Sequence, residues 1–184
     1  MANKTIENCT VGEAYLALLA DRGVDYLFAN AGTDFAPLIE AFAKAETLGT
    51  ATPTPITVPH ENVAMSMAIG YALMTGRPQA VMVHVNVGTA NALCGLMNAA
   101  RGDVPVLFTA GRTPITEQGS AASRDIDIHW AQEMFDQAGV VREMVKWDYE
   151  LRNAPQLETV VDRALCIARS EPQGPVYLTL PLEV

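Results

Sequence analysis

The sequence predicts an α/β fold in which an open, mostly parallel, doubly wound sheet carries helices on both faces. Strand-like and helix-like segments alternate along the chain, an order typical of parallel sheets with helical crossovers. The segments 80–85 (AVMVHV) and 104–110 (VPVLFTA) are almost entirely apolar, as expected for strands buried on both faces. The length of 184 residues suits a single domain with one core.

The first half of the chain is predicted to begin with a helix at Val11. Thr10 and Glu13 have the spacing of a capping box, and apolar residues then recur on one face as far as Gly23, which suits a helix end. The elements expected next are a strand over 25–30, a turn over 31–33, a helix over 35–46 with Asp34 as its N-cap, a loop over 50–55, a strand over 56–58 and a helix over 61–75.

The second half continues the alternation around one long polar loop. Ligands of open α/β sheets bind at the carboxyl ends of the strands, so the loops 30–34, 59–62 and 86–91 form the predicted site. The elements expected here are a strand over 80–85, a helix over 89–100, a strand over 104–110, a loop over 111–124, a short helix over 129–137, a strand over 140–147, a helix over 155–170 and a strand over 176–180.

Composition excludes several classes of partner. The net charge of −9 argues against nucleic acid or an anionic membrane as a partner. The odd, widely spaced set of Cys9, Cys94 and Cys166 predicts free thiols in a reducing compartment. Residues 1–10 lack the pattern of a signal peptide, and no apolar run is long enough to span a membrane. We therefore expect a soluble, cytoplasmic protein.

Several common chemical motifs are missing. The chain has no G-x-G-x-x-G after its first predicted strand, no P-loop and no G-x-S-x-G nucleophile elbow. These absences argue against a dinucleotide site, a P-loop enzyme and an α/β-hydrolase. The histidines His60, His84 and His129 lack metal-ligand spacing, so no metal site is expected on this chain.

What remains is an ordered set of motifs at predicted strand ends. The sequence VPHEN (58–62) takes a strand into a helix that reads ENVAMSMAIGYALMTGRP, and an apolar strand then enters the loop NVGTAN (86–91). This order resembles the pyrimidine-binding, N-terminal domain of thiamine diphosphate (ThDP) enzymes, over residues 10–184. In that family a glutamate stands at the first of these turns, and a Gly-Thr/Ala-x-Asn loop, matched here by Gly88 and Asn91, follows the next strand.

Details of the motifs are similar to two branches of the family. His84 stands where benzoylformate decarboxylases carry an active-site histidine, and NAGT (30–33) matches their Asn-Pro-Gly-Ser turn, with Thr33 at the serine position. The pair His60-Glu61 and the segment HWAQE around His129 are similar to acetolactate synthase-like members. Asn86-Val87 replaces the Gly-Pro that is common in acetolactate synthases.

The resemblance implies a cofactor and a set of site residues. ThDP would be bound here by its pyrimidine end, whereas Mg²⁺ and the diphosphate would sit on a separate domain with a Gly-Asp-Gly motif that this chain lacks. The implied catalytic residues are Glu61 and His84, the implied cofactor-binding residues are Glu61, Gly32, Thr33, Gly88 and Asn91, and the implied substrate-pocket residues are Thr33, His60 and His129.

The role implied for Glu61 requires a carboxyl group that shares a proton with N1′ of the aminopyrimidine. Burial favours the neutral form of a carboxyl group, and Val58, Pro59, Val63 and Ala64 are expected to form apolar walls. The helix N-terminus opposes this by favouring the anion by about 0.3–1 kcal/mol. We expect burial to dominate. On local pattern alone, such a glutamate is more often an ordinary first-turn charge, and a histidine such as His84 more often a core residue.

The function implied is half of a ThDP site for decarboxylation or carboligation of a small 2-oxo acid, inactive in isolation. The chain is expected to be a single domain, either excised from a three-domain enzyme or one subunit of a split enzyme, and its ending, LEV, favours the excised domain. Its expected partner is the diphosphate-binding domain or subunit, and the apolar helix over 61–75 predicts a homo-oligomer, a dimer above all. A non-catalytic module of the same fold remains open, either binding a small anion near Gly88 or serving dimerisation.

Overall fold

The computed structural model describes residues 8–184, so most of the N-terminal segment tested above for a signal peptide lies outside it. One sheet of six strands has the order β2-β1-β3-β4-β6-β5, and every pairing is parallel. The strands are β1 (Tyr26–Asn30), β2 (Thr54–Thr57), β3 (Gln79–Val83), β4 (Val106–Arg112), β5 (Asp148–Glu150) and β6 (Val176–Pro181).

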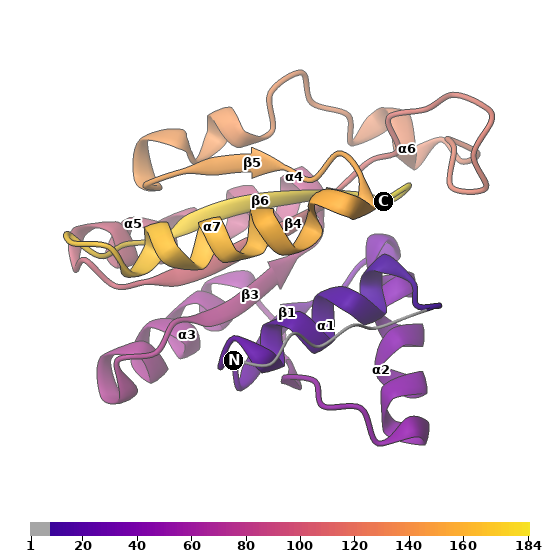
Figure 1. The fold of residues 1–184 in the computed structure, drawn as a ribbon. Coiled ribbons are helices and arrows are strands. Elements are labelled where there is room, and N and C mark those ends of the chain that lie inside the picture. Colours follow the sequence, from indigo (N-terminus) through magenta and orange to yellow (C-terminus); the bar gives the residue numbers. More distant parts are fainter. Residues whose placement is uncertain (1–7) are drawn as a thin grey trace.

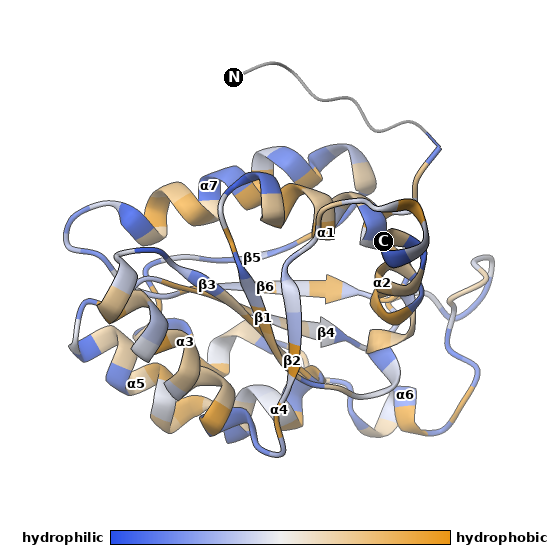
Figure 2. Cartoon of the chain, turned by 90° about the horizontal axis from the view of Figure 1, so that it is seen from below, coloured by the Kyte–Doolittle hydropathy of each residue, from blue (hydrophilic) through white to orange (hydrophobic). Residues whose placement is uncertain are grey.

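Helices cover both faces of the sheet, which confirms the predicted fold class. Helices α1 and α7 lie on one face, with α2 packed beside α1, and α3 and α5 lie side by side on the other face (Figures 1 and 2). The helices are α1 (Val11–Asp21), α2 (Ala36–Leu48), α3 (Glu61–Thr75), α4 (Val85–Asn91), α5 (Leu93–Arg101), α6 (Ile128–Ala131) and α7 (Leu157–Arg169), with short 3₁₀ turns η1 (Thr33–Phe35), η2 (Ala138–Val140), η3 (Arg142–Met144) and η4 (Ala154–Gln156).

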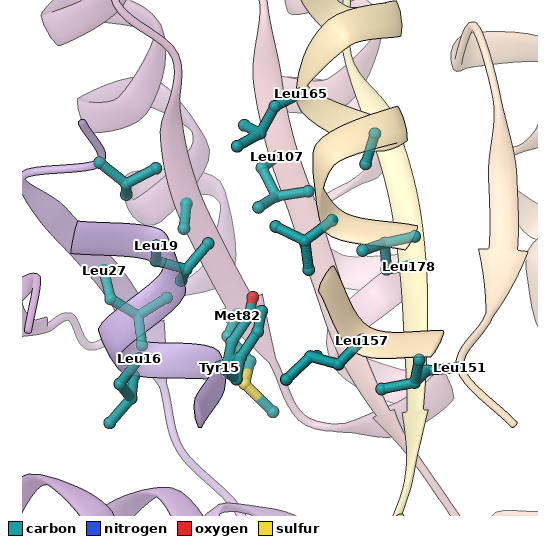
Figure 3. Packing of buried hydrophobic residues seen from close by; sticks show 14 of the residues in the cluster. Tyr15, Leu16, Leu19, Leu27, Met82, Leu107, Leu151, Leu157, Leu165 and Leu178 are labelled. Carbon is teal, nitrogen blue, oxygen red and sulfur yellow. The ribbon is translucent and has the colours of Figure 1, made fainter. Parts of the chain in front are cut away.

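The sheet separates two hydrophobic clusters, one under each helical layer. Burying a leucine-sized side chain contributes about 1.5–3 kcal/mol, so these clusters hold the two layers on the sheet. Figure 3 shows the cluster between α1, α7 and the strands, where residues far apart in the sequence interdigitate. The residues labelled there are Tyr15, Leu16, Leu19, Leu27, Met82, Leu107, Leu151, Leu157, Leu165 and Leu178.

Helix α1 begins and ends where the sequence signals predict. The Thr10 hydroxyl accepts a hydrogen bond from the Glu13 N–H at 3.2 Å. The Glu13 carboxylate accepts a hydrogen bond from Lys44 of α2 at 2.9 Å, so this residue also joins α1 to α2. Gly23 follows the helix with φ +81°, a left-handed conformation that glycine adopts without steric cost.

Some predicted elements differ from the observed ones. The helix expected over 89–100 begins earlier, at Val85, and is divided at Ala92 into α4 and α5. The strand expected over 56–58 begins at Thr54, inside the predicted loop, because β1 pairs with it from Tyr26 onward. The helix expected over 129–137 is limited to the four residues of α6.

The strand predicted over 140–147 is wrong. This segment forms 3₁₀ turns, and the edge strand β5 comes after it. Its apolar residues Val140, Val141, Met144 and Val145 recur at helical spacing and pack against the second hydrophobic cluster. The backbone therefore coils to place them on one side, which an alternating strand cannot do.

Asp34 does not act as the predicted helix cap. The 3₁₀ turn η1 precedes α2, whose N-cap is Phe35, without a side-chain capping bond. The Asp34 carboxylate instead faces the end of β3. Of the cysteines, Cys94 and Cys166 carry exposed free thiols. No helix within residues 8–184 is long and apolar enough to cross a membrane.

Candidate functional site

The candidate site lies at the carboxyl ends of the central strands. Asp34 follows β1, Glu61 follows β2 and His84 follows β3, and these strands are neighbours in one parallel sheet. The carboxyl ends of parallel strands share one edge, where α/β folds bind ligands. The first part of the long segment between β4 and β5, which includes α6, lies at this same end, toward the right in Figure 1.

Glu61 is the first residue of α3 and is buried, with 8% of its surface exposed. The preceding residue, His60, caps the helix: its Nδ1 accepts a hydrogen bond from the Asn62 N–H at 3.1 Å. The Glu61 Oε2 atom accepts a hydrogen bond from the side-chain amide of Asn91, at the end of α4. The fold thus brings together two residues, 30 positions apart, that the sequence singled out.

A second contact fixes the start of α3 against α5. The Asn62 Oδ1 atom accepts a hydrogen bond from the Gly95 N–H at 2.6 Å. A Cβ atom on Gly95 would lie 2.6 Å from both Asn62 Oδ1 and the Cβ of Met65, a separation that side chains do not reach. The two helices therefore approach each other as closely as a glycine allows, which holds Asn91 beside Glu61.

His84 lies directly after β3 and forms the centre of a three-residue chain. Its Nδ1 is 2.6 Å from Asp34 Oδ1, and its Nε2 is 3.1 Å from the amide nitrogen of Gln132. The hydrogen bond with Asp34 is the main reason that the pKa of His84 is raised, and burial opposes it. The negative charges of Asp34 and Glu61 raise the pKa of His84 further.

The glycines of the predicted site leave room for close packing. A Cβ on Gly32 would overlap the His84 imidazole, and a Cβ on Gly88 would lie 2.9 Å from the Cβ of Val83. Next to His84, Val85 has φ +33°, which β-branched residues rarely adopt, and its N–H points to Asp34 Oδ2 at 3.4 Å. The turn from β3 into α4 is therefore tightly constrained.

The predicted substrate-pocket residues are two surface residues and one buried residue. Thr33 and His60 are exposed. His129 is buried, but its Nδ1 lies 3.4 Å from the N–H and from the carboxylate of Asp125, in its own segment. The part of this segment that reaches His84 is Gln132. Sequence reasoning missed Gln132, for which no local pattern exists, and treated Asp34 only as a helix cap.

A buried hydrogen-bond network lies behind α4. The Thr89 hydroxyl donates to the Val85 carbonyl at 2.7 Å and is 2.7 Å from the Tyr177 hydroxyl. The Gln137 amide donates to the Tyr177 hydroxyl and to the Gly111 carbonyl, each at 3.0 Å. Burial raises the pKa of Tyr177 to about 12, so the phenol stays neutral and can donate to Thr89. The network joins α4, β6 and the segment after α6.

The long segment between β4 and β5 is anchored by charge. Glu133 bonds Arg112 at 3.2 Å, the Thr113 hydroxyl at 2.9 Å and the guanidinium of Arg124. Arg112 also bonds Glu150 of β5 at 2.5 Å. Because Glu133 is next to Gln132, this cluster fixes the residue that touches His84. Among residues 8–184, no three His, Cys, Asp or Glu side chains are placed to hold a metal ion.

One face of the α3–α5 layer carries exposed apolar side chains. Val63, Met67 and Met74 are 43%, 39% and 86% exposed, and their spacing places them along one side of α3. Val87 of α4 and Met97 of α5 are also exposed, at 54% and 39%. The outward side of these helices therefore carries several exposed apolar side chains.

Comparison with known proteins relates this architecture to one family. The family model described as "Thiamine pyrophosphate enzyme, N-terminal TPP binding domain" matches residues 9–140. The acetolactate synthase large subunit of Haemophilus influenzae is 29% identical over 169 residues, which are 92% of this chain and 27% of that protein. The benzoylformate decarboxylase of Pseudomonas aeruginosa is 28% identical over 179 residues, which are 95% of this chain and 30% of that protein.

A solved structure is similar to this chain in both fold and sequence. The thiamine diphosphate-dependent 4-hydroxybenzoylformate decarboxylase of Rhodococcus jostii RHA1 superposes with a TM-score of 0.72 and 27% sequence identity. The match covers 95% of this chain and 30% of that chain. The chain therefore spans less than a third of the length of each of these three relatives.

Proposed function

The chain belongs to the family of N-terminal TPP-binding domains of thiamine pyrophosphate (ThDP) enzymes, and from this premise we propose that it forms the pyrimidine-binding half of the cofactor site of a 2-oxo acid decarboxylase or carboligase. The observation that carries the proposal is the buried carboxyl group of Glu61 at the strand-end edge, held by Asn91. The relatives are named as acetolactate synthases and a benzoylformate decarboxylase. These names support decarboxylation or carboligation of a 2-oxo acid as the reaction class.

The residues present fit the aminopyrimidine end of ThDP. Glu61 uses Oε2 for Asn91, and its Oε1 has no hydrogen-bond partner within residues 8–184, so it can face a ring nitrogen. Asn86 Oδ1, on α4 between His84 and Gly88, is a buried acceptor that also lacks a partner in the described part of the chain. A buried acceptor without a donor is costly, so it suits a site that a ligand or a neighbouring domain completes.

ThDP, when bound, supplies the carbanion chemistry of the reaction. The Glu61 carboxyl group would hold N1′ of the aminopyrimidine through a hydrogen bond, and Asn91 keeps this carboxyl group in one orientation. The burial of Glu61 keeps water away from its carboxyl group, which would strengthen the hydrogen bond to the aminopyrimidine. His84 exchanges a proton with the reacting 2-oxo acid, a role supported by its place at the strand-end edge and by its hydrogen bonds with Asp34 and Gln132.

A separate domain or subunit binds the diphosphate and Mg²⁺. This is supported by the absence of Gly-Asp-Gly from the sequence and by the much greater length of the relatives. The exposed apolar face of α3, α4 and α5 supplies the surface for that partner. We propose the same arrangement whether the two halves are domains of one polypeptide or subunits.

The test is Glu61→Gln in the enzyme assembled with its diphosphate-binding partner. Glutamine keeps the size of the side chain and removes the titratable proton, so C2–H exchange of bound ThDP should slow by about 10²–10⁴-fold, the usual contribution of acid–base catalysis. Exchange is measured by NMR, and circular dichroism checks the fold. The matched control is Glu40→Gln on the exposed side of α2, which should leave exchange unchanged. Exchange at the wild-type rate in Glu61→Gln would remove Glu61 from the mechanism.

A further inference from the structure

The contact between Asp34 and His84 has features that an incidental ion pair lacks. Asp34 Oδ1 and His84 Nδ1 are 2.6 Å apart, although the residues are 50 positions apart in the sequence. Only 6% of the Asp34 side chain and 19% of the His84 side chain are exposed. A carboxylate and an imidazole removed from water this far need a well-formed hydrogen bond to offset their desolvation.

Two glycines leave the space that this pair fills. A Cβ on Gly32 would overlap the His84 imidazole, and a Cβ on Gly111 would overlap the Asp34 carboxylate. Gly32 follows β1, and Gly111 belongs to β4, so two separate elements avoid a side chain here. The geometry of the pair is therefore built into the strand ends.

We propose that Asp34 is a positioning residue for His84: it holds the imidazole as the Nδ1–H tautomer and directs Nε2 to the reaction site. The proposal rests on the proposed function only for the proton transfer between Nε2 and the substrate. An ionised carboxylate has no proton to give, so Nδ1 must be the donor, and in the neutral ring Nε2 then carries the lone pair. The Gln132 amide, 3.1 Å from Nε2, lies where it can donate to that lone pair.

The charged groups that face His84 act in the same direction. They are Asp34 of η1 and Glu61 of α3, and the third neighbour, Gln132, is uncharged. Both carboxylates favour the imidazolium, and the pKa of His84 is raised chiefly through its hydrogen bond with Asp34. Nε2 is thus a proton donor below this raised pKa and an acceptor above it. Asp34 sets the pH at which the change occurs.

The first test observes His84 directly by ¹⁵N NMR of this chain, without any reaction. The wild-type imidazole should show the Nδ1–H tautomer at high pH. In Asp34→Asn the hydrogen bond can survive without the charge, so the titration midpoint should move to lower pH while the tautomer is retained. In Asp34→Ala both the raised midpoint and the single tautomer should be lost. An Nε2–H tautomer in the wild-type chain overturns the proposal even if the variants do not fold.

The matched control is Asp125→Asn, which changes a carboxylate that faces a different imidazole, that of His129, at 3.4 Å. It should leave the titration of His84 unchanged. A His84 midpoint that is the same in Asp34→Asn as in the wild type overturns the positioning role.

The second test is the pH profile of kcat/KM in the enzyme assembled with its diphosphate-binding partner. Asp34→Asn should move the limb that reports His84 to lower pH, whereas a purely structural defect would lower activity equally at every pH. If the NMR midpoint moves and the profile does not, Asp34 still positions His84, but His84 has no part in the reaction. That result would reject the catalytic role proposed for His84 and leave the Asp34 contact intact.

Discussion

Single side chains decide how the elements around the site are joined. The Tyr177 hydroxyl is the clearest case, because it lies between Thr89 of α4 and Gln137 of the segment after α6. Tyr177 has no exposed surface, so water cannot replace either partner. Asp34 is comparable, since a carboxylate that looks like a helix cap in the sequence contacts His84 in the fold. In both cases the partner is distant in sequence, and the bond is sheltered from solvent.

Tyr177→Phe should lower the free energy of unfolding by about 1–3 kcal/mol, because buried groups lose a hydrogen-bond partner. Urea unfolding followed by circular dichroism measures the change. Tyr149→Phe, which removes a phenol oxygen from the half-buried edge strand β5, is the control and should cost less. Equal effects of the two substitutions would show that the buried network contributes nothing specific.

At the scale of the elements, the site depends on how α3 and α5 pack. Glu61 is on α3, and Asn91 ends α4 just before α5, so the spacing of these helices sets the contact between the two side chains. Gly95 is the point of closest approach, through its N–H bond to Asn62. The helix pair is therefore part of the site, because its contact at Asn62 lies next to Glu61 at the start of α3.

Gly95→Ala should destabilise the chain by about 1–3 kcal/mol, the usual cost of overpacking, since the new Cβ would meet Asn62 and Met65 at 2.6 Å. Gly70→Ala, on the exposed side of α3, is the matched control, because a Cβ there meets nothing within 4 Å. It should be neutral or stabilise the helix by about 0.5–1 kcal/mol. Thermal unfolding of both variants measures the difference, and a stable Gly95→Ala would mean that the helices can move apart freely.

At the scale of the whole molecule, the net charge of −9 and the apolar α3 face have opposing effects on association. Like charges keep copies of the chain apart, whereas exposed apolar side chains favour contact. The sheet covers only one side of α3, and its outer stripe of Val63, Met67 and Met74 is open in the chain alone. A partner surface is the natural cover for this stripe.

The chain in isolation should therefore form a homo-oligomer, most simply a two-fold dimer, through the α3 face. Met67→Glu should shift the population toward monomer, because it places a charge in the apolar contact. Leu48→Glu, which adds the same charge at the end of α2, should not. Size-exclusion chromatography with light scattering measures the mass. A wild-type chain that is monomeric at high concentration would place the partner surface elsewhere.

The sequence by itself determined the fold class, the start of α1 and the position of Glu61 at the start of α3. These features depend on hydrophobic period and on capping, which are local and can be found in a short window. The strand-end rule also predicts the edge of the sheet at which the candidate site lies. The local pattern gives a wrong strand over residues 140–147, where apolar residues at helical spacing lie in 3₁₀ turns.

Only the tertiary structure decided which side chains meet at that edge. Asp34 contacts His84 across 50 positions because β1 and β3 are adjacent in the sheet. Gln132 contacts His84 across 48 positions because the long segment after β4, which ion pairs anchor, folds back over the ends of these strands. The same path leaves His129 in its own segment, paired with Asp125. Such contacts depend on strand order and loop path, which no local pattern encodes, so the site's edge could be predicted but its hydrogen-bond partners could not.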